Sequence, residues 1–417
     1  MDMVSYYPWS TYAYGKYDYV SNLSIVGNQI MRYLGISEGF HDAAVALVNE
    51  EREIEFASQS ERFTRIKNCR MNPPEYRRLR HDKVIFHEDV KLKNERRVAH
   101  GMKPLPVPGY ETYLKHHESH MAAARWTAPW DTSNDTVCVV IDAIGEWDCT
   151  TIWKDGEIVY SEQYPQSLGL FYSAMTAHVG LKPMEDEYVL MGMAAYGKPI
   201  YQVAMEEEFF VDPDCEEPDR SVAMKKNLQK GLPKSYLGRD RCALLDQWGH
   251  HSLDYDIAAS AQAVVEKRIF EYARHALIKT KSDNLVFMGG VALNCVANSK
   301  LFALFSNVHI MPNPGDAGSS LGAAALYHFE QTGNFVQWEG PYLGTNIKGS
   351  WPKEKFLESL RKGEIFGVAN GRAEFGPRAL GNRSLFADAR GTEIKDKVNA
   401  IKRRQEFRPF APIVLEE

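Results

Sequence analysis

The chain has 417 residues with a formal net charge of −6, and 44% of them are hydrophobic and 25% charged. These values are typical of a globular protein with two or three domains and a well-buried core. The negative net charge excludes an overall positive potential that would attract the chain to nucleic acid or to a membrane surface. No apolar run approaches the roughly 18 residues that a membrane span needs, so we expect no membrane partner.

The N-terminus and the cysteines bear on where the protein works. Residues 1–30 hold six tyrosines and lack the basic start and apolar stretch of a signal peptide. We interpret them as an N-terminal extension. The six cysteines are scattered, without a C-x-x-C pair. In a chain of this length they favour reduced thiols over a disulfide frame or a zinc site, which predicts a cytoplasmic protein.

Two segments share one pattern of strand, short polar loop, strand, polar turn and strand. They are residues 33–63 and residues 136–165. Their polar turns, NEERE and KDGE, are typical of hairpins. A repeated unit of this kind in the two halves of a chain can reflect an internal duplication. Because hairpins are common, two ordinary meanders are the interpretation that the pattern alone favours.

Elsewhere, predicted helices alternate with predicted strands, which is typical of an α/β fold. The predicted elements, in chain order, are helices at 111–126, 168–180 and 256–280 and strands at 284–288 and 308–312. Residues 200–250 are charged and irregular, so we expect a surface insertion there. A linker at 340–348 precedes a further unit that begins at about residue 351.

Two histidines form the first candidate site. His116 and His120 are four residues apart on a predicted helix, so their side chains leave the same face. Neutral imidazoles at this spacing can bind one divalent metal. Pairs of this kind are more often a chance cluster on a surface helix, which is the interpretation that the spacing alone favours. The order H-x-E-x-H excludes the zinc-protease motif H-E-x-x-H.

Four glycine-containing loops form the second candidate site: SEGFHD, DAIGEWD, GGVALN and NPGDAGSS. Glycine lets backbone N–H groups approach an anion, and a helix N-terminus adds a favourable dipole. Four such loops favour a nucleotide or phosphate cleft. Asp142 and Asp316 lie in these loops, where they either hold a metal or its waters or cap helices.

The third candidate site is the run NGRAEFGPRALGNRSLFAD at residues 370–388. Its cations, with those just downstream, are Arg372, Arg378, Arg383, Lys402, Arg403, Arg404 and Arg408. Guanidinium groups match planar oxyanions such as phosphate and carbamate. The segment lacks the interleaved aromatic residues of single-strand binders. The pattern therefore favours a small anion over a nucleic-acid patch, and a structural ion network stays an alternative.

These residues carry a resemblance to a known family. GRAEFGPRALGNRSLFAD and FRPFAPIVLE resemble the start of the C-terminal domain of O-carbamoyltransferases of the nodulation-factor, cephamycin and tobramycin type. LGISEGFHDAAVALV, SQSERFTRIKN, HHESHMAAA, VVIDAIGEW, EYVLMGMAAYGKP, GGVALNCVANSKL and NPGDAGSSLGAA resemble N-terminal blocks of the same family, in the same order. The resemblance covers residues 31–417. The N-terminal part is also similar to the threonylcarbamoyl-tRNA enzymes of the actin-like ATPase superfamily.

The resemblance implies an α/β fold. Residues 31–350 would form a duplicated actin-like ATPase core with ribonuclease H-like halves. Residues 351–417 would form the start of a truncated α+β C-terminal domain. The implied activity is that of a transferase of one-carbon groups. The C-terminal domain would make carbamoyladenylate from carbamoyl phosphate and ATP with Mg²⁺. The core would then carbamoylate a hydroxyl of a small molecule, sugar or nucleoside.

The resemblance also assigns residues to roles. The metal, Fe²⁺, would be held by His116, His120 and Asp316. His41 and Asp42 would be catalytic, with His41 as the base for the acceptor hydroxyl. The nucleotide-binding residues would be Gly145, Glu146, Gly289, Gly290 and Asn294. The carbamoyl phosphate-binding residues would be Arg372, Arg378, Arg383, Lys402 and Arg404.

Three departures from the family pattern matter. Val189 stands where the family has lysine and Ala195 where it has proline, and residues 402–405 lack the usual histidine and glutamate. The family continues beyond the position of Glu417. One alternative is therefore a nucleotide- and metal-binding module that needs a second chain for activity. The other is tRNA modification of the threonylcarbamoyl type, which the acidic pI disfavours. A homodimer is compatible with either.

Overall fold

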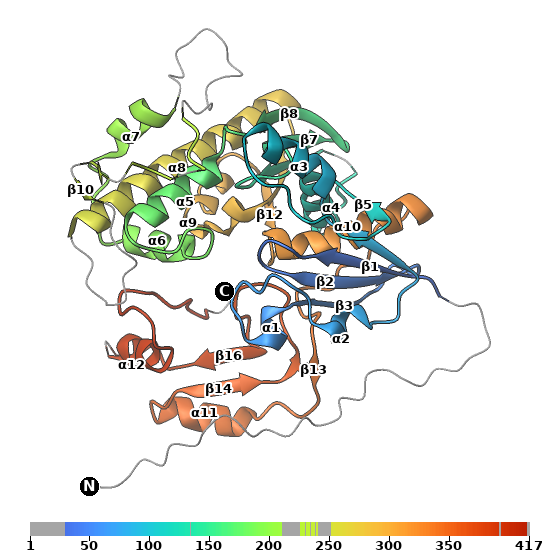
Figure 1. The fold of residues 1–417 in the computed structure, drawn as a ribbon. Coiled ribbons are helices and arrows are strands. Elements are labelled where there is room, and N and C mark those ends of the chain that lie inside the picture. Colours follow the sequence, from blue (N-terminus) through green and yellow to red (C-terminus); the bar gives the residue numbers. More distant parts are fainter. Residues whose placement is uncertain are drawn as a thin grey trace.

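The computed structural model describes residues 30–133, 135–210, 226–229, 231–233, 235–237, 239–240, 252–391 and 393–414. Nearly all of the predicted N-terminal extension and most of the predicted insertion lie outside the described residues. Figure 1 shows two α/β lobes, with the last part of the chain below them.

The first lobe is built on a mixed five-stranded sheet of order β3-β2-β1-β4-β5. Its strands are β1 (Arg32–Ser37), β2 (Ala44–Asn49), β3 (Ile54–Gln59), β4 (Lys83–Phe86) and β5 (Thr112–Tyr113). The first three strands are antiparallel neighbours, whereas β4 and β5 run parallel to β1. Every residue of β2 is buried, as expected for a sheet with both faces covered.

The second lobe repeats this topology. Its sheet has the order β12-β11-β6-β7-β8, with β6, β7 and β8 antiparallel and β11 and β12 parallel to β6. The strands are β6 (Thr136–Ile141), β7 (Asp148–Lys154), β8 (Glu157–Gln163), β11 (Asn284–Met288) and β12 (Asn307–Ile310). The predicted α/β class and duplicated ribonuclease H-like core are therefore confirmed.

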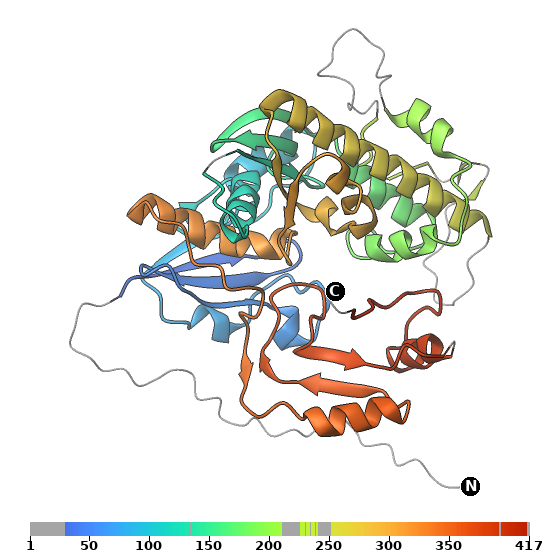
Figure 2. The ribbon, with the colours of Figure 1, turned by 180° about the vertical axis from the view of Figure 1, so that it is seen from behind.

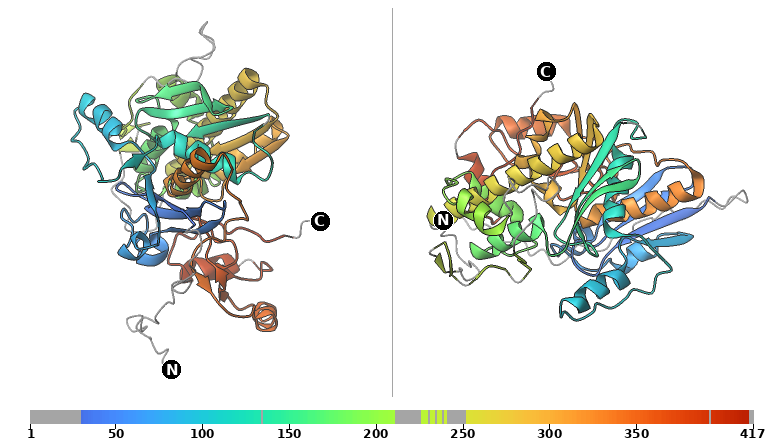
Figure 3. Two further views of the ribbon diagram at one scale, coloured as in Figure 1. Left: turned by 90° about the vertical axis from the view of Figure 1, so that its right-hand side faces the viewer. Right: turned by 90° about the horizontal axis from the view of Figure 1, so that it is seen from above.

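Two helices lie between the sheets (Figures 1 and 3). Helix α4 (His116–Thr127) contacts strands of the second sheet, and α10 (Asp316–Thr332) contacts strands of the first. Their backbones touch, because a Cβ at Gly322 would lie 1.8 Å from the carbonyl oxygen of Ser119. A Cβ at Gly35 of β1 would likewise lie 1.9 Å from the carbonyl oxygen of Ser320. Glycine is therefore required at both contacts.

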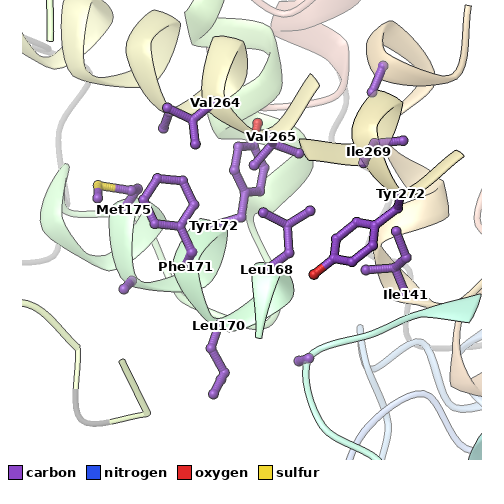
Figure 4. Close-up of a cluster of buried hydrophobic side chains, with 14 of the residues drawn as sticks. Ile141, Leu168, Leu170, Phe171, Tyr172, Met175, Val264, Val265, Ile269 and Tyr272 are labelled. Carbon is purple, nitrogen blue, oxygen red and sulfur yellow. The ribbon is translucent and has the colours of Figure 1, made fainter. Parts of the chain in front are cut away.

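The core of the second lobe is closed by helices on the outer side of its sheet. Figure 4 shows Phe171, Tyr172 and Met175 of α5 facing Val264 and Val265 of α8. The helices and short helical turns of this lobe are α5 (Leu168–His178), α6 (Glu187–Ala194), α7 (Gln202–Phe209), α8 (Ser252–Thr280), η2 (Gly290–Leu293), α9 (Cys295–Asn298) and η3 (Leu301–Ala303). A small hairpin, β9 (Ser235–Tyr236) and β10 (Arg239–Asp240), lies in the predicted insertion.

The C-terminal unit lies below both lobes (Figure 2) and holds two two-stranded sheets. Its elements are β13 (Asn346–Ile347), α11 (Lys353–Arg361), β14 (Phe366–Ala369), β15 (Gly371–Arg372), β16 (Arg383–Phe386) and α12 (Ile394–Ile401). Arg62 donates to the carbonyl oxygen of Gly376 at 2.9 Å. The hydroxyl of Tyr196 donates to the carbonyl oxygen of Phe407 at 3.1 Å. Both lobes therefore contact this unit.

The segment before the second sheet corrects the sequence prediction. The helix predicted at 111–126 begins only at His116, because Thr112–Tyr113 pairs with β4 as strand β5. In this region the sequence analysis did not predict β4 or α3 (Val90–Ala99). It also did not predict the short helices α1 (Glu61–Thr64) and α2 (Pro74–Arg77). Among the described residues, no helix combines the length and apolar character that crossing a bilayer requires.

The α4–α10 contact gives a stability prediction. Gly322→Ala forces a methyl group against the Ser119 carbonyl and should lower the free energy of unfolding by about 3 kcal/mol, the upper end for overpacked cores. Gly349→Ala is the control, since a Cβ there meets open space. Urea denaturation measures both, and equal stability of the two variants would contradict the packing described.

Candidate metal centre and active site

Four side chains converge between the two lobes: His116, His120, Asp142 and Asp316. One ligand atom of each lies within 4.8 Å of the others. The two Nε2 atoms are 3.2 Å apart, and Asp142 Oδ2 lies 3.0 Å from His116 Nε2. Asp316 Oδ1 lies 3.5 Å from His120 Nε2. Both histidines are fully buried.

Each side chain reaches the site for a local reason. The histidines occupy one face of the first turns of α4. Asp142 directly follows β6, the central strand of the second sheet, and Asp316 is the first residue of α10. Because α4 and α10 touch, their N-terminal residues meet at the end of β6. The predicted metal residues His116, His120 and Asp316 are thus brought together, and Asp142 joins them.

The donor set fits a divalent cation. Two imidazole nitrogens and two carboxylates are common ligands of divalent first-row metals. Both Nε2 atoms point at Asp142 Oδ2, at 3.0 and 3.2 Å, so the donor atoms converge on one point as the ligands of a metal do. Two buried carboxylates also repel unless a positive charge lies between them.

Charges within the cluster shift the pKa values of its members. Burial alone would lower the pKa of His116, but Asp316 and Asp142 raise it well above its usual value. Burial would raise the pKa of Asp142, yet the two histidines hold it well below its usual range. Against burial and the charge of Asp142, the histidines lower the pKa of Asp316 to about 2. The carboxylates are therefore ionised at neutral pH and attract a cation.

His41 and Asp42, in the β1–β2 loop, lie beside this cluster. His41 Nδ1 is 2.9 Å from Asp42 Oδ2, and His41 Nε2 is 3.7 Å from Asp316 Oδ2. Asp42 has a positive φ of 51°, an uncommon conformation for a residue with a side chain. Burial would lower the pKa of His41, but Asp316 and Asp42 raise it to about 9. Both side chains are partly exposed, so a substrate can reach them.

The predicted nucleotide-binding residues surround the same cluster. Gly289 has a φ of 94°, and a Cβ there would lie 2.2 Å from the carbonyl oxygen of Ile141. The N–H of Gly290 donates to Asp142 Oδ1 at 3.3 Å. Asn294 accepts from the N–H of Ala297 at 3.1 Å. Gly289, Gly290 and Asn294 therefore lie in the segment that follows β11, and Gly290 contacts Asp142 of the cluster.

Gly145 and Glu146 belong to the loop between β6 and β7, which lies against the N-terminus of α4. A Cβ at Gly145 would lie 3.0 Å from the ring of His117. Glu146 is buried, and Oε1 accepts from the N–H of His116 at 2.9 Å and from that of Asp89 at 2.7 Å. Its carboxylate thus caps α4 and fixes the helix that carries both histidine ligands. A part in nucleotide binding stays a prediction for both residues.

Most of the predicted carbamoyl phosphate-binding residues bond to the protein itself. Arg372 donates to the carbonyl oxygens of Glu55 and Leu343 at 2.6 and 2.7 Å. Arg383 donates to four carbonyl oxygens, and Arg404 to Asn399 and Pro409. Arg378 and Lys402 are exposed, and their side chains have no hydrogen-bond or ion-pair partner among the described residues. Anion binding by this group stays a prediction.

Two buried charges near the cluster were missed by the sequence reasoning. Glu88 and Lys93 form an ion pair behind His116. They flank the start of α3, a helix that the sequence reasoning did not find. A signal was present: Asp89 follows the apolar run KVIF and caps the N–H groups of Lys91 and Leu92.

The chain is similar to proteins of one known family. Residues 110–325 match the family described as carbamoyltransferase N-terminus, and residues 357–417 match carbamoyltransferase C-terminus. The chain belongs to the carbamoyltransferase family. An uncharacterized protein of Synechocystis is 31% identical over 92% of this chain and 75% of its own length.

Two further relatives of this carbamoyltransferase family member carry descriptive names. Nodulation protein NolO of Bradyrhizobium diazoefficiens is 32% identical over 73% of this chain and 59% of its own length. The 3'-hydroxymethylcephem-O-carbamoyltransferase of Streptomyces clavuligerus is 33% identical over 56% of this chain and 45% of its own length. The chain thus spans about half of these two relatives. Among solved structures, an activator of the 2-hydroxyisocaproyl-CoA dehydratase from Clostridium difficile has a TM-score of 0.41 at 14% identity, over 73% of this chain and 96% of its own.

The cluster predicts a metal that depends on its histidines. His116→Ala combined with His120→Ala should abolish bound metal, because two of four donors are lost. Elemental analysis of the purified protein measures the metal content. His100→Ala is the control, since His100 is exposed at the end of α3. Unchanged metal content in the double variant would reject the assignment.

Proposed function

We propose that the chain carries the transfer site of an O-carbamoyltransferase. The carbamoyl donor would be carbamoyladenylate, made from carbamoyl phosphate and ATP with Mg²⁺, and the acceptor a hydroxyl of a small molecule, sugar or nucleoside. The observation that carries the proposal is the pairing of the buried His116–His120–Asp142–Asp316 cluster with the partly exposed His41–Asp42 pair, in a chain of the carbamoyltransferase family.

In the transfer step, the acceptor oxygen forms a bond to the carbamoyl carbon. The bond between that carbon and the phosphate oxygen breaks, and AMP leaves. A divalent cation held by His116, His120, Asp142 and Asp316 would supply Lewis acidity toward the carbamoyl carbonyl. We propose Fe²⁺, because imidazole and carboxylate donors suit it.

His41 would take the proton of the acceptor hydroxyl. With Nδ1 hydrogen-bonded to Asp42, the proton of the neutral ring stays on Nδ1, and Nε2 is free to accept. The resulting imidazolium is stabilised by Asp42 on one side and Asp316 on the other. The same carboxylates raise the pKa of His41 to about 9, so the neutral ring that accepts the proton becomes the main form only above about pH 9. Asp42 thus orients the base, as the carboxylate of a catalytic triad does.

The nucleotide part of the donor would bind to the loops around Asp142. At Gly145, Gly289 and Gly290 the absence of a Cβ makes room for His117, Ile141 and Asp142, and this packing brings the two loops together. Asn294 caps the helix that follows. Carbamoyl phosphate would bind in the C-terminal unit. Arg378 and Lys402 are the best candidates there, because Arg372, Arg383 and Arg404 bond to protein oxygens.

A second candidate is a nucleotide- and metal-binding module that needs a partner chain for activity. The exposed apolar residues of the C-terminal unit favour it. Leu385 is 45% exposed and Ile401 57%, and the sheets of this unit have only two strands each. Two-stranded sheets are marginally stable alone, and exposed apolar surface marks contact with further protein.

The activity test is an incubation with carbamoyl phosphate, ATP and an acceptor library, with a partner chain that supplies a complete C-terminal domain. We expect release of pyrophosphate and acceptors heavier by one carbamoyl group, detected by mass spectrometry. Acceptors that stay unmodified in a system that does release pyrophosphate would reject the proposed transfer site.

The His41 assignment has its own prediction. His41→Asn should slow carbamoyl transfer roughly 100- to 10,000-fold, because general base catalysis contributes that much. Pyrophosphate release should stay unchanged, since the adenylate would form in the C-terminal domain. Metal content is measured in the same samples, because His41 Nε2 lies 3.7 Å from Asp316. Product formation is followed by mass spectrometry, with His100→Asn as the control. A transfer rate like that of the control would contradict the role of His41.

A further inference from the structure

A buried ion pair lies directly behind the metal cluster. Lys93 Nζ is 2.5 Å from Glu88 Oε2, and the side chains are only 9% and 4% exposed. Burying two charges is unfavourable unless they pair closely, and apolar residues of similar volume often serve stability better. Fold stability alone therefore does not explain the pair.

Glu88 lies beside Nδ1 of His116, on the side of the ring that faces away from the cluster. Its Oε2 lies 3.6 Å from His116 Nδ1, whereas Nε2, on the other side of the ring, points into the cluster. His116 Nδ1 is buried and lacks a hydrogen-bond partner. An imidazole that donates its Nε2 lone pair to a metal carries its proton on Nδ1. That proton needs an acceptor, and the Glu88 carboxylate lies beside it.

Glu88 is held in this place by helix α3. The N–H of Asp89 donates to Glu146 Oε1, which also accepts from the N–H of His116. Arg96, one turn after Lys93, donates to the carbonyl oxygen of Glu146. The start of α3 and the start of α4 thus share Glu146 as a common anchor. The distance between Glu88 and the His116 ring is fixed by this backbone arrangement.

We propose that Glu88, held by Lys93, positions His116 as a metal ligand through Nδ1. Glu88 is a positioning residue, since it does not reach the ligand atoms themselves. A carboxylate behind a ligating imidazole fixes the ring orientation and makes Nε2 a stronger donor. Lys93 balances the charge of Glu88 so that the carboxylate stays in the interior. The inference rests on the metal assignment proposed above.

The test compares metal affinities of charge-matched variants of the full chain. Glu88→Leu with Lys93→Met removes both charges at similar volume and leaves no unpaired buried charge, so we expect it to fold. Glu88→Asp keeps both charges but withdraws the carboxylate from His116 by one methylene. The control is Glu95→Leu with Lys91→Met, the same charge change at exposed positions of α3.

Co²⁺ is the probe, with affinity measured by chelator competition and ligand geometry by the visible absorption spectrum. We expect affinity to fall roughly 10- to 100-fold in the double variant and in Glu88→Asp, with an altered spectrum. The control should match the wild type. A merely structural role would change the free energy of unfolding but not the affinity or spectrum of the folded protein.

Two results would overturn the proposal. One is wild-type affinity with a wild-type spectrum in either folded Glu88 variant. The other is an equal loss of affinity in the control, which would point to a general charge effect. A wild-type chain that binds no Co²⁺ would instead reject the metal assignment itself, and with it this inference. That failure appears before any variant is compared, so the two outcomes are distinguishable.

Discussion

The backbone contact between α4 and α10 is the constraint on which the rest of the arrangement depends. Helix α4 follows the first sheet in the chain but packs on the second, and α10 follows the second sheet but packs on the first. Glycine at position 322 lets the two helices touch. Because each helix packs on the sheet of the other lobe, the first residues of both helices lie at the end of β6. A histidine pair and two aspartates then meet where the lobes join.

The cluster formed in this way is electrostatically unbalanced without a cation. The ligand oxygens of Asp142 and Asp316 lie within 4.8 Å of each other in a buried site. Their repulsion is about 3–4 kcal/mol at the effective dielectric constant of a protein near 20. A divalent cation bound among the four side chains would offset that repulsion. The same negative field raises the pKa of His41 at the open side.

The sequence predicted the repeated units well because their signals are local. Alternating apolar and polar residues and hairpin turns located the six strands of the two meanders, and the i, i+4 spacing placed His116 and His120 on one helix face. It did not predict β4 or α3, because β4 is four residues long and α3 carries few apolar residues. Glu88 and Lys93 were missed with them. The hydrogen bonds of Arg372 and Arg383 to carbonyl oxygens could not be predicted, because spacing along the chain does not reveal which oxygens will lie beside a guanidinium group. Anion binding by this group stays a prediction.

The central claim is that one metal ion joins the two lobes at His116, His120, Asp142 and Asp316. Anomalous X-ray diffraction from crystals grown with the metal tests it most directly. We predict one strong peak among these four side chains, with metal–ligand distances of roughly 2.0–2.2 Å. A map with no peak there, or with its peak at other residues, would contradict the account.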